Sequence, residues 1–206
     1  MKRKTIGRAV AAFGLVALVV AATAIAQPNS RQVVSPACKS AGVGFASVLS
    51  GPASALGIDQ EHWARVFLLY WNTNKPIVGL PKNFKRTKIR IRAVGDSQLN
   101  PQVAATIGGQ MLSNKQVLAM MGFVGSNETL GGGPVLDRGG LLYVSSSATR
   151  DDLGSQLKNF YRVVPNNLAQ ARLAVGHLLK IGGIKSGQQA MVVDDAEAYA
   201  ANQADD

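Results

Sequence analysis

Three short polar segments have the residue types and positions needed to hold a small anionic ligand. The first, Gly125-Ser126-Asn127-Glu128-Thr129, directly follows the most apolar predicted strand and opens a predicted helix. Ser126 or Asn127 is expected to cap that helix, whose free N–H groups and positive dipole end favour a carboxylate or a phosphate. Helix capping by itself would explain the same residues, because nearly every helix needs a cap.

The second segment, Ser145-Ser146-Ser147-Ala148-Thr149, follows the next predicted strand, and the third, Asp194-Asp195 with Tyr199, follows the last one. Open α/β sheets bind their ligands outside the carboxyl ends of the strands. Hydroxyl groups that follow two adjacent strands should therefore face one crevice. That convergence indicates a ligand site more strongly than either segment does, and Tyr199 would offer an aromatic surface to an apolar part of the ligand.

Catalytic chemistry has little support in the sequence. There is no Gly-x-Ser-x-Gly elbow, no Gly-Lys-Ser/Thr phosphate loop and no Gly-x-Gly-x-x-Gly after the first strand. His62 and His177 fall in predicted helices without motif partners, and Cys38, the single cysteine, has no Cys/His cluster. A secreted α/β hydrolase would need a His or Asp placed to activate Ser145, Ser146 or Ser147. We therefore predict no enzyme activity, no metal site and no cofactor.

The elements that must position the polar segments alternate along the chain. Trp63, Val66, Phe67 and Tyr70 recur at helical spacing, and residues 117–124 form the nearly continuous apolar run of a central parallel strand. Strands are predicted at 43–49, 88–94, 117–124, 141–145, 160–164 and 189–193, and helices at 58–73, from Pro101, from Ser126 and at 167–181. This order predicts an α/β domain with a doubly wound parallel sheet.

The glycines Gly131, Gly132 and Gly133 fall inside the helix predicted from Ser126. Each glycine in a helix costs about 1 kcal/mol relative to alanine. Close packing against a neighbouring element, or a locally broken helix, would explain them.

The amino terminus has the pattern of an export signal. Basic residues Lys2, Arg3, Lys4 and Arg8 precede an uncharged run that ends at Ala24-Ile25-Ala26, a sequence that signal peptidases accept. We predict a signal peptide at 1–26 and a polar connector at 27–41; an uncleaved membrane anchor is the alternative, since the apolar run is long. The chain is thus expected to be secreted, periplasmic or on the extracytoplasmic face of the membrane, where a lone thiol such as Cys38 is unusual.

The net charge of +10 would fall to +6 without the signal, since four of the 22 basic residues and none of the 12 acidic ones lie there (22 − 4 − 12 = 6). Much of the remaining positive charge is crowded into one short stretch that holds Lys82, Lys85, Arg86, Lys88, Arg90 and Arg92. A nucleic-acid site would need interleaved aromatic residues, and only Phe84 is there. A solvated loop and strand edge is the better interpretation, and no nucleic-acid partner is predicted.

A series of short motifs, taken in order, resembles a known family. They are Ser50-Gly51-Pro52, Asp96 with Pro101, Gly122-x-x-Gly125-Ser126, Ser147-Ala148-Thr149, Phe160-Tyr161-Arg162-Val163-Val164-Pro165 and Asp195-x-x-x-Tyr199. The run, from about Val43 to Tyr199, is similar to the branched-chain amino acid (leucine/isoleucine/valine) substrate-binding proteins of ABC transporters, which have a type I periplasmic binding fold.

The resemblance implies a two-lobed protein that closes on an amino acid or amide and delivers it to a membrane permease without catalysing a reaction. Residues 42–164 would form the first lobe, and residues 165–206 only the beginning of a truncated second lobe. In this chain the implied ligand-binding residues are Ser126, Asn127, Ser147, Ala148, Thr149 and Tyr199.

The resemblance also assigns roles to those residues. The hydroxyl groups of Ser126 and Thr149 and the Thr149 N–H would bind the ligand carboxylate, and the Ser147 carbonyl its ammonium group. The sequence departs from the family at Leu56, where an aromatic residue is frequent, and at Ala200-Ala201-Asn202, where Gly-x-Gly is usual. The family's acidic partner for the ammonium lies in the missing part, so this chain alone is expected to bind weakly.

A second hypothesis comes from another class of function. A single lobe could serve as an extracytoplasmic sensing or interaction module with no role in transport. Its exposed lobe face and unpaired sheet edge would then favour self-association.

Overall fold

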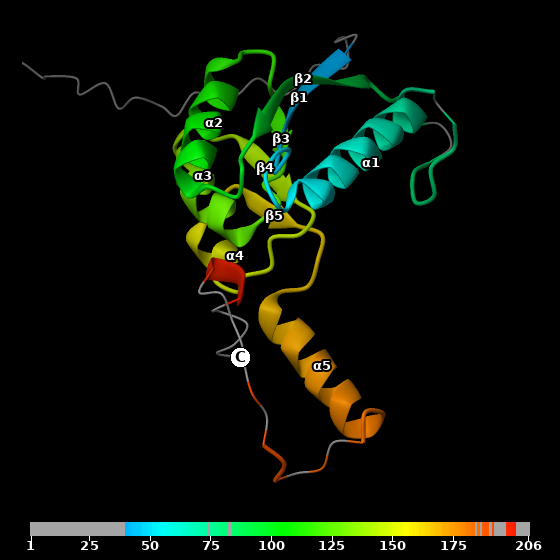
Figure 1. Ribbon diagram of the computed structural model, residues 1–206. Coiled ribbons are helices and arrows are strands. Elements are labelled where there is room, and N and C mark those ends of the chain that lie inside the picture. The colour runs from blue at the N-terminus through cyan, green and yellow to red at the C-terminus, as the bar shows by residue number, and fades with distance from the viewer. Residues whose placement is uncertain are drawn as a thin grey trace, which may run out of the picture.

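A computed structural model describes residues 40–73, 75–81, 84–183, 185, 187–189, 191 and 197–200 (Figure 1). The signal peptide predicted at 1–26, the connector up to residue 39 with Cys38, and Asp194 and Asp195 lie outside the described residues. So does most of the strand predicted at 189–193.

Five parallel strands form one sheet at the centre of the molecule. They are β1 (Ser40–Ser47), β2 (Lys88–Asp96), β3 (Ala119–Met121), β4 (Leu142–Ser145) and β5 (Phe160–Arg162). Their order is β2-β1-β3-β4-β5, with every neighbouring pair parallel. The chain therefore has the predicted parallel α/β architecture, and the apolar run that contains β3 occupies the middle of the sheet, as expected.

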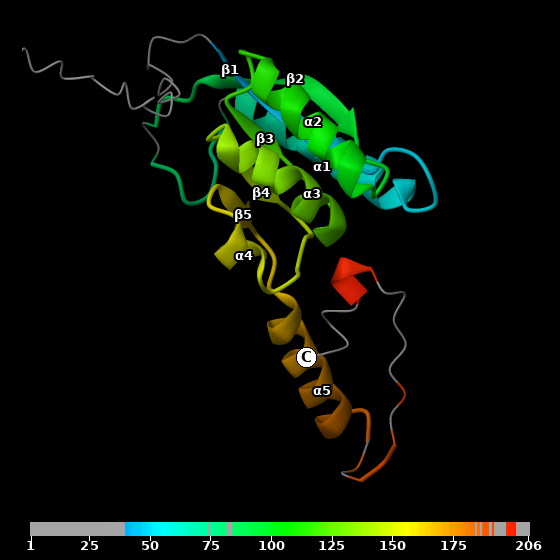
Figure 2. The same ribbon diagram turned by 90° about the vertical axis from the view of Figure 1, so that its left-hand side faces the viewer.

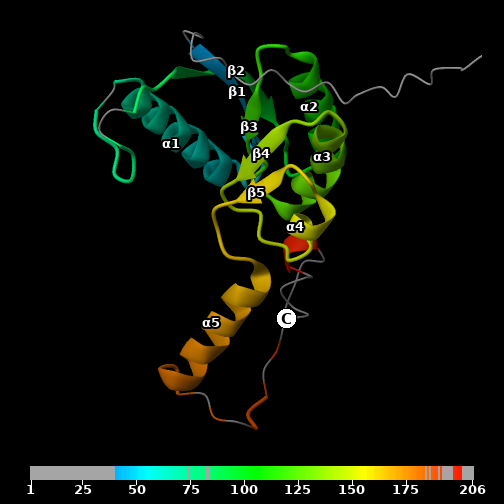
Figure 3. The ribbon, with the colours of Figure 1, turned by 180° about the vertical axis from the view of Figure 1, so that it is seen from behind.

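Helices cover both faces of this sheet. They are α1 (Ser54–Asn72), α2 (Pro101–Ser113), α3 (Ser126–Arg138), α4 (Leu153–Gln156) and α5 (Asn167–Lys180). The pair α2 and α3 lies on one face, and α1 lies on the other, against β1 and β2 (Figures 1 and 3). Helix α5 follows the sheet and points away from it (Figure 2). Among the described residues, no helix is both long and apolar enough to span a bilayer.

The structure differs from the prediction at the end of β3 and in the short helix α4, and local geometry explains both differences. Strand β3 ends at Met121 because Gly122 adopts a φ of +121°, and a Cβ there would lie 2.0 Å from the carbonyl oxygen of Ala46. Only glycine tolerates that conformation and that approach. Helix α4 was not predicted, since a single turn is too short to show a periodic apolar pattern.

The helix starts are fixed by polar groups. Pro101 begins α2 as predicted, and the Asn100 side chain accepts hydrogen bonds from the N–H groups of Gln102 and Val103 at 2.9 and 3.0 Å. The cap of α3 is Gly125, so the prediction of Ser126 or Asn127 was wrong. The reason is that the Glu128 carboxylate accepts the Gly125 N–H, which leaves the Ser126 and Asn127 side chains for other partners.

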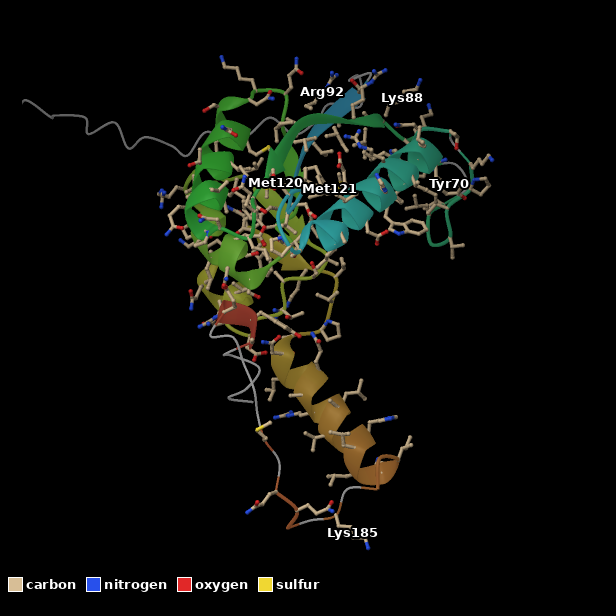
Figure 4. All side chains as sticks on the ribbon, viewed as in Figure 1. Tyr70, Lys88, Arg92, Met120, Met121 and Lys185 are labelled. Atoms are coloured by element: carbon tan, nitrogen blue, oxygen red, sulfur yellow. The ribbon has the colours of Figure 1, made fainter. Side chains whose placement is uncertain are left out.

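The core lies between the sheet and the α2–α3 pair. Met120 is buried there, whereas Met121, the next residue of β3, belongs to the opposite face (Figure 4). Helix α3 continues unbroken through the three glycines. Glycine is needed there because a Cβ on Gly131 would lie 2.2 Å from the Pro101 carbonyl oxygen, and one on Gly132 would lie 2.3 Å from the Phe123 ring. Close packing, one of the two explanations offered for them, is the one observed.

The face of the sheet that carries α1 is only partly covered. Parallel sheets of α/β proteins normally bury both faces. Here large apolar side chains of α1, β4 and β5 remain exposed, among them Trp63, Val66, Phe67, Leu69, Tyr70, Leu142 and Tyr161. The described part of the chain thus leaves an apolar surface beside α1.

Candidate ligand-binding site

A cavity of about 1050 Å³ opens at the carboxyl ends of β3 and β4. The start of α1, the start of α3 and the loop after β4 form its walls. Five residues close it from the side of α5: Val164, Pro165, Gln170, Glu197 and Tyr199. It is lined by Pro52, Ala53, Leu56, Leu99, Val124, Gly125, Ser126, Asn127, Ser146, Ser147, Thr149, Val164, Pro165, Gln170, Glu197 and Tyr199. The cavity lies at the edge where open α/β sheets hold small ligands.

The structure brings together most of the residues that the sequence singled out. Ser126, Asn127, Ser147, Thr149 and Tyr199 all line this cavity. Because β3 and β4 are neighbouring strands, the hydroxyl groups that follow them face the same crevice, as predicted. Ala148 does not line it.

Ala148 lies instead in the hydrophobic core and is fully buried. Its N–H donates to the Ser145 hydroxyl at 2.9 Å, and the N–H of Ser147 donates to the same oxygen at 3.2 Å. The Ser145 hydroxyl therefore shapes the loop after β4, although it does not line the cavity.

Thr149 has a backbone that is held in place and a hydroxyl group that is not satisfied. Its carbonyl oxygen accepts hydrogen bonds from the Asn167 N–H at 2.9 Å and the Arg162 guanidinium at 3.0 Å. Only 6% of the residue is exposed, and the structure gives its hydroxyl oxygen no hydrogen-bond partner among the described residues. A buried polar group of this kind is costly unless a ligand satisfies it.

Gln60 of α1 fixes the two serines that line the cavity. Its amide nitrogen donates to the Ser147 hydroxyl at 2.9 Å, and its amide oxygen accepts the Ser146 hydroxyl at the same distance. The Ser147 hydroxyl in turn donates to the Val124 carbonyl at 2.7 Å. No pattern in the sequence indicates this role, since Gln60 is one polar residue on an amphipathic helix.

The amino terminus of α3 presents Ser126 to the cavity over a buried acid. The Ser126 hydroxyl accepts the Arg150 N–H at 3.2 Å. Below it, the fully buried carboxylate of Glu128 accepts the Ser97 hydroxyl and the Gly125 N–H. Desolvation raises the pKa of Glu128 and the charge of Asp96 adds to that rise, while the two hydrogen bonds partly offset it.

Asp96, at the end of β2, shapes the loop that leads into α1. Its carboxylate accepts the Leu49 N–H at 2.8 Å and the Ser50 hydroxyl at 2.6 Å, and it also accepts the Gln98 N–H. Desolvation would raise the pKa of Asp96, but these hydrogen bonds together hold it below its ordinary value. The neighbouring residues Pro52 and Ala53 are thereby positioned on the cavity wall.

The short turn at 198–200 is attached to the rest of the molecule by side chains from three elements. Asn127 accepts the Ala198 N–H at 2.7 Å, Arg150 donates to the Ala198 carbonyl at 3.5 Å, and Asn167 donates to the Tyr199 carbonyl at 3.0 Å. This turn is the short red segment of Figure 1. Asn127, predicted as a ligand residue, therefore also holds the wall that carries Tyr199.

The comparisons with known proteins agree with this geometry. A family model described as periplasmic binding protein matches residues 40–206. Sequence comparison with curated proteins gives no match.

Solved structures with a similar fold include three transport-related binding proteins. The branched-chain amino acid transporter substrate binding protein LivJ from Streptococcus pneumoniae, in complex with isoleucine, is 20% identical with a TM-score of 0.60 over 69% of this chain and 39% of its own. The leucine binding protein LivK from Thermotoga maritima is 19% identical, with a TM-score of 0.55 over 69% of this chain and 38% of its own. A solute binding protein of an ABC transporter from Rhodopseudomonas palustris, in complex with 3,4-dihydroxy benzoic acid, is 16% identical. Its TM-score is 0.56 over 71% of this chain and 38% of its own. The chain thus spans about two fifths of the length of these proteins.

Proposed function

The chain belongs to the periplasmic binding protein family, and from that premise we propose that it binds a small amino-acid-like ligand in the cavity beside β3 and β4. The protein acts outside the cytoplasm and delivers the ligand to an ABC permease. It catalyses no reaction. The 20% identical LivJ protein was solved with isoleucine and supports an amino acid as ligand, although that likeness by itself concerns the fold.

The observation that carries the proposal is the hydroxyl of Thr149. It is buried at the cavity wall without a partner among the described residues, while the backbone around it is firmly held. Across the same crevice, Ser126 and Asn127 lie in the first turn of α3, where N–H groups have no partner within the helix and the dipole favours an anion. A ligand carboxylate between Thr149 and Ser126 would satisfy both.

The remaining walls suit the rest of such a ligand. Leu56, Leu99, Val124 and Val164 offer apolar surface to an aliphatic or aromatic side chain. Glu197 also lines the cavity, next to the Ala198 whose N–H Asn127 accepts, and its carboxylate supplies a negative charge for an ammonium group. An amphiphile with one carboxylate therefore fits better than a sugar or a polyphosphate, which would need more polar walls.

Saturation-transfer NMR with leucine, isoleucine, valine and leucinamide tests this function, since the method detects binding in the millimolar range, about −4 kcal/mol. Leucine should bind at least about tenfold tighter than leucinamide, because the amide lacks the charged acceptor, whose hydrogen bonds are worth about 1.5–3 kcal/mol. Thr106→Val on the exposed face of α2 is the control for Thr149→Val. Equal binding of leucine and leucinamide, or no signal with any of the amino acids, would contradict the proposal.

A second candidate function is that of an interaction module that associates with itself. The exposed apolar side chains of α1 favour it, with Trp63 66% and Leu69 69% exposed. Light scattering on the purified chain distinguishes the two functions. A monomer that binds leucine supports the receptor, whereas a concentration-dependent dimer that Trp63→Glu disrupts, without ligand binding, supports the module.

A further inference from the structure

Glu128 lies directly behind the ligand site but makes none of the contacts proposed for the ligand. It is the third residue of α3, and it is fully buried. One of its carboxylate oxygens, Oε2, accepts the N–H of Gly125, and a Cβ on Gly125 would lie 2.5 Å from the same oxygen. Because Gly125 lines the cavity, a single residue separates this carboxylate from a bound ligand.

An ionised Glu128 competes with a ligand carboxylate for the same positive groups. The first turn of α3 offers N–H groups and the positive end of the helix dipole, and Ser126 lines the cavity there. The charge of Glu128 occupies the Gly125 N–H and offsets the dipole from inside the protein. Two like charges at one helix end repel each other, and they do so more strongly in a buried setting than in water. An ionised Glu128 therefore weakens the binding of an anion.

The charges around Glu128 do not cancel this repulsion. Asp96, at the end of β2, is an acid and adds to the negative potential at Glu128. The helices α2 and α4, which pack against α3, carry no ionisable side chain, and Tyr143 of β4 stays neutral because burial raises its pKa. In the loop after β4, Arg150 and Asp152 pair with each other at 2.7 Å. No cation of the described residues forms an ion pair with Glu128.

Protonation of Glu128 removes the repulsion and leaves the local structure intact. A neutral carboxyl group keeps an oxygen that accepts the Gly125 N–H, and its own O–H can donate to the Ser97 hydroxyl, which already contacts it. Desolvation raises the pKa of Glu128, the two hydrogen bonds partly offset that rise, and the charge of Asp96 adds to it. The net rise extends the protonated form to higher pH.

We propose that Glu128 couples ligand binding to the uptake of a proton, so that the site holds a ligand carboxylate more tightly when Glu128 is protonated. The inference rests on the proposed function, since it needs a carboxylate between Ser126 and Thr149. If protonation favours the ligand, the ligand favours protonation by the same factor. Affinity is therefore high at low pH and falls as the pH rises through the pKa of Glu128.

NMR titration of the full chain with leucine, from about pH 5 to about pH 8, tests the proposal, because the ligand carboxylate stays ionised throughout this range. The affinity of the wild type should fall by about tenfold as the pH rises. The affinity of Glu128→Gln should fall less, because glutamine imitates the neutral carboxyl group. Glu61→Gln removes an acid of α1 that pairs with Arg65 outside the cavity, and it should behave like the wild type.

The difference between the proteins isolates Glu128, because Glu197, the histidines and the ligand titrate in all three. A pH-stat measurement adds a test that needs no variant, since leucine added to the unbuffered wild type should take up protons. Proton uptake, with a fall in affinity that Glu128→Gln removes, supports the proposal. An equal fall in Glu128→Gln, or leucine binding to the wild type with constant affinity and no proton uptake, overturns this inference alone. Absence of leucine binding at every pH overturns the proposed function as well.

Discussion

The amide of Gln60 donates a hydrogen bond to the hydroxyl of Ser147 across 87 positions of sequence, at 2.9 Å. This bond ties α1 to the loop after β4. Because the same amide also accepts the Ser146 hydroxyl, one side chain sets the orientation of two residues of the cavity wall. The wall residues of α1 and those of the loop after β4 are thereby linked to each other.

Gln60→Ala should lower both stability and ligand affinity. The loss of hydrogen bonds to Ser146 and Ser147 should reduce the free energy of unfolding by about 1 kcal/mol, the usual net value of such bonds. Leucine affinity should fall as well, because the serines are no longer oriented. Urea denaturation and ligand titration measure the two effects, with the exposed Gln102→Ala on α2 as the matched control. Affinity equal to that of the Gln102 variant would rule out a positioning role.

Thr149→Val should separate binding from folding. The variant removes a buried hydroxyl that has no partner among the described residues, so the ligand-free chain should be as stable as the wild type or more stable. Leucine affinity should nevertheless fall by about tenfold or more, as expected for a lost hydrogen bond to a charged group.

Tyr143→Phe is the matched control for the Thr149 substitution. The Tyr143 hydroxyl is also buried without a described partner, but it lies in the core and not at the cavity. This variant should be at least as stable as the wild type and should bind leucine normally. Thermal unfolding and titration check both, and a Thr149→Val variant that binds like Tyr143→Phe would exclude Thr149 from the ligand site.

Glu128→Gln should remove a pH dependence of stability. Burial raises the pKa of Glu128, so between its ordinary value of 4.5 and its raised native value the folded state binds more protons than the unfolded state. The free energy of unfolding of the wild type should therefore fall relative to the variant as the pH rises through that window. Asp96 and Asp152 have lowered pKa values and lose their contributions at more acidic pH, but they do so in both proteins. A difference between the two proteins that stays constant with pH would contradict this prediction.

Gly132→Ala and Gly109→Ala should have opposite effects on stability. A Cβ on Gly132 would meet the Phe123 ring at 2.3 Å and the Ala104 carbonyl at 2.9 Å, so overpacking should cost about 1–3 kcal/mol. A Cβ on Gly109 meets nothing within 4 Å, and alanine should stabilise α2 by about 0.5–1 kcal/mol. Chemical denaturation measures both changes. A destabilising effect of Gly109→Ala would show that local helix propensity does not limit the stability of α2.

Local patterns determined the elements and the edge of the sheet at which polar residues gather. The alternation of apolar runs and amphipathic stretches predicted six strands, and five of them form the parallel sheet that the structure describes. Pro101 marked a helix start, because period and turn chemistry are properties of short segments. For the same reason the sequence placed Ser126, Ser147 and Thr149 at strand ends, and their presence in one cavity followed from the order of the strands.

Only the tertiary structure decided which polar groups are already satisfied. It gave the cap of α3 to Gly125 with Glu128, moved Ala148 into the core, added Gln60 to the support of the serines and left the Thr149 hydroxyl without a described partner. Such pairings depend on distances between residues far apart in the chain, and no local spacing encodes them.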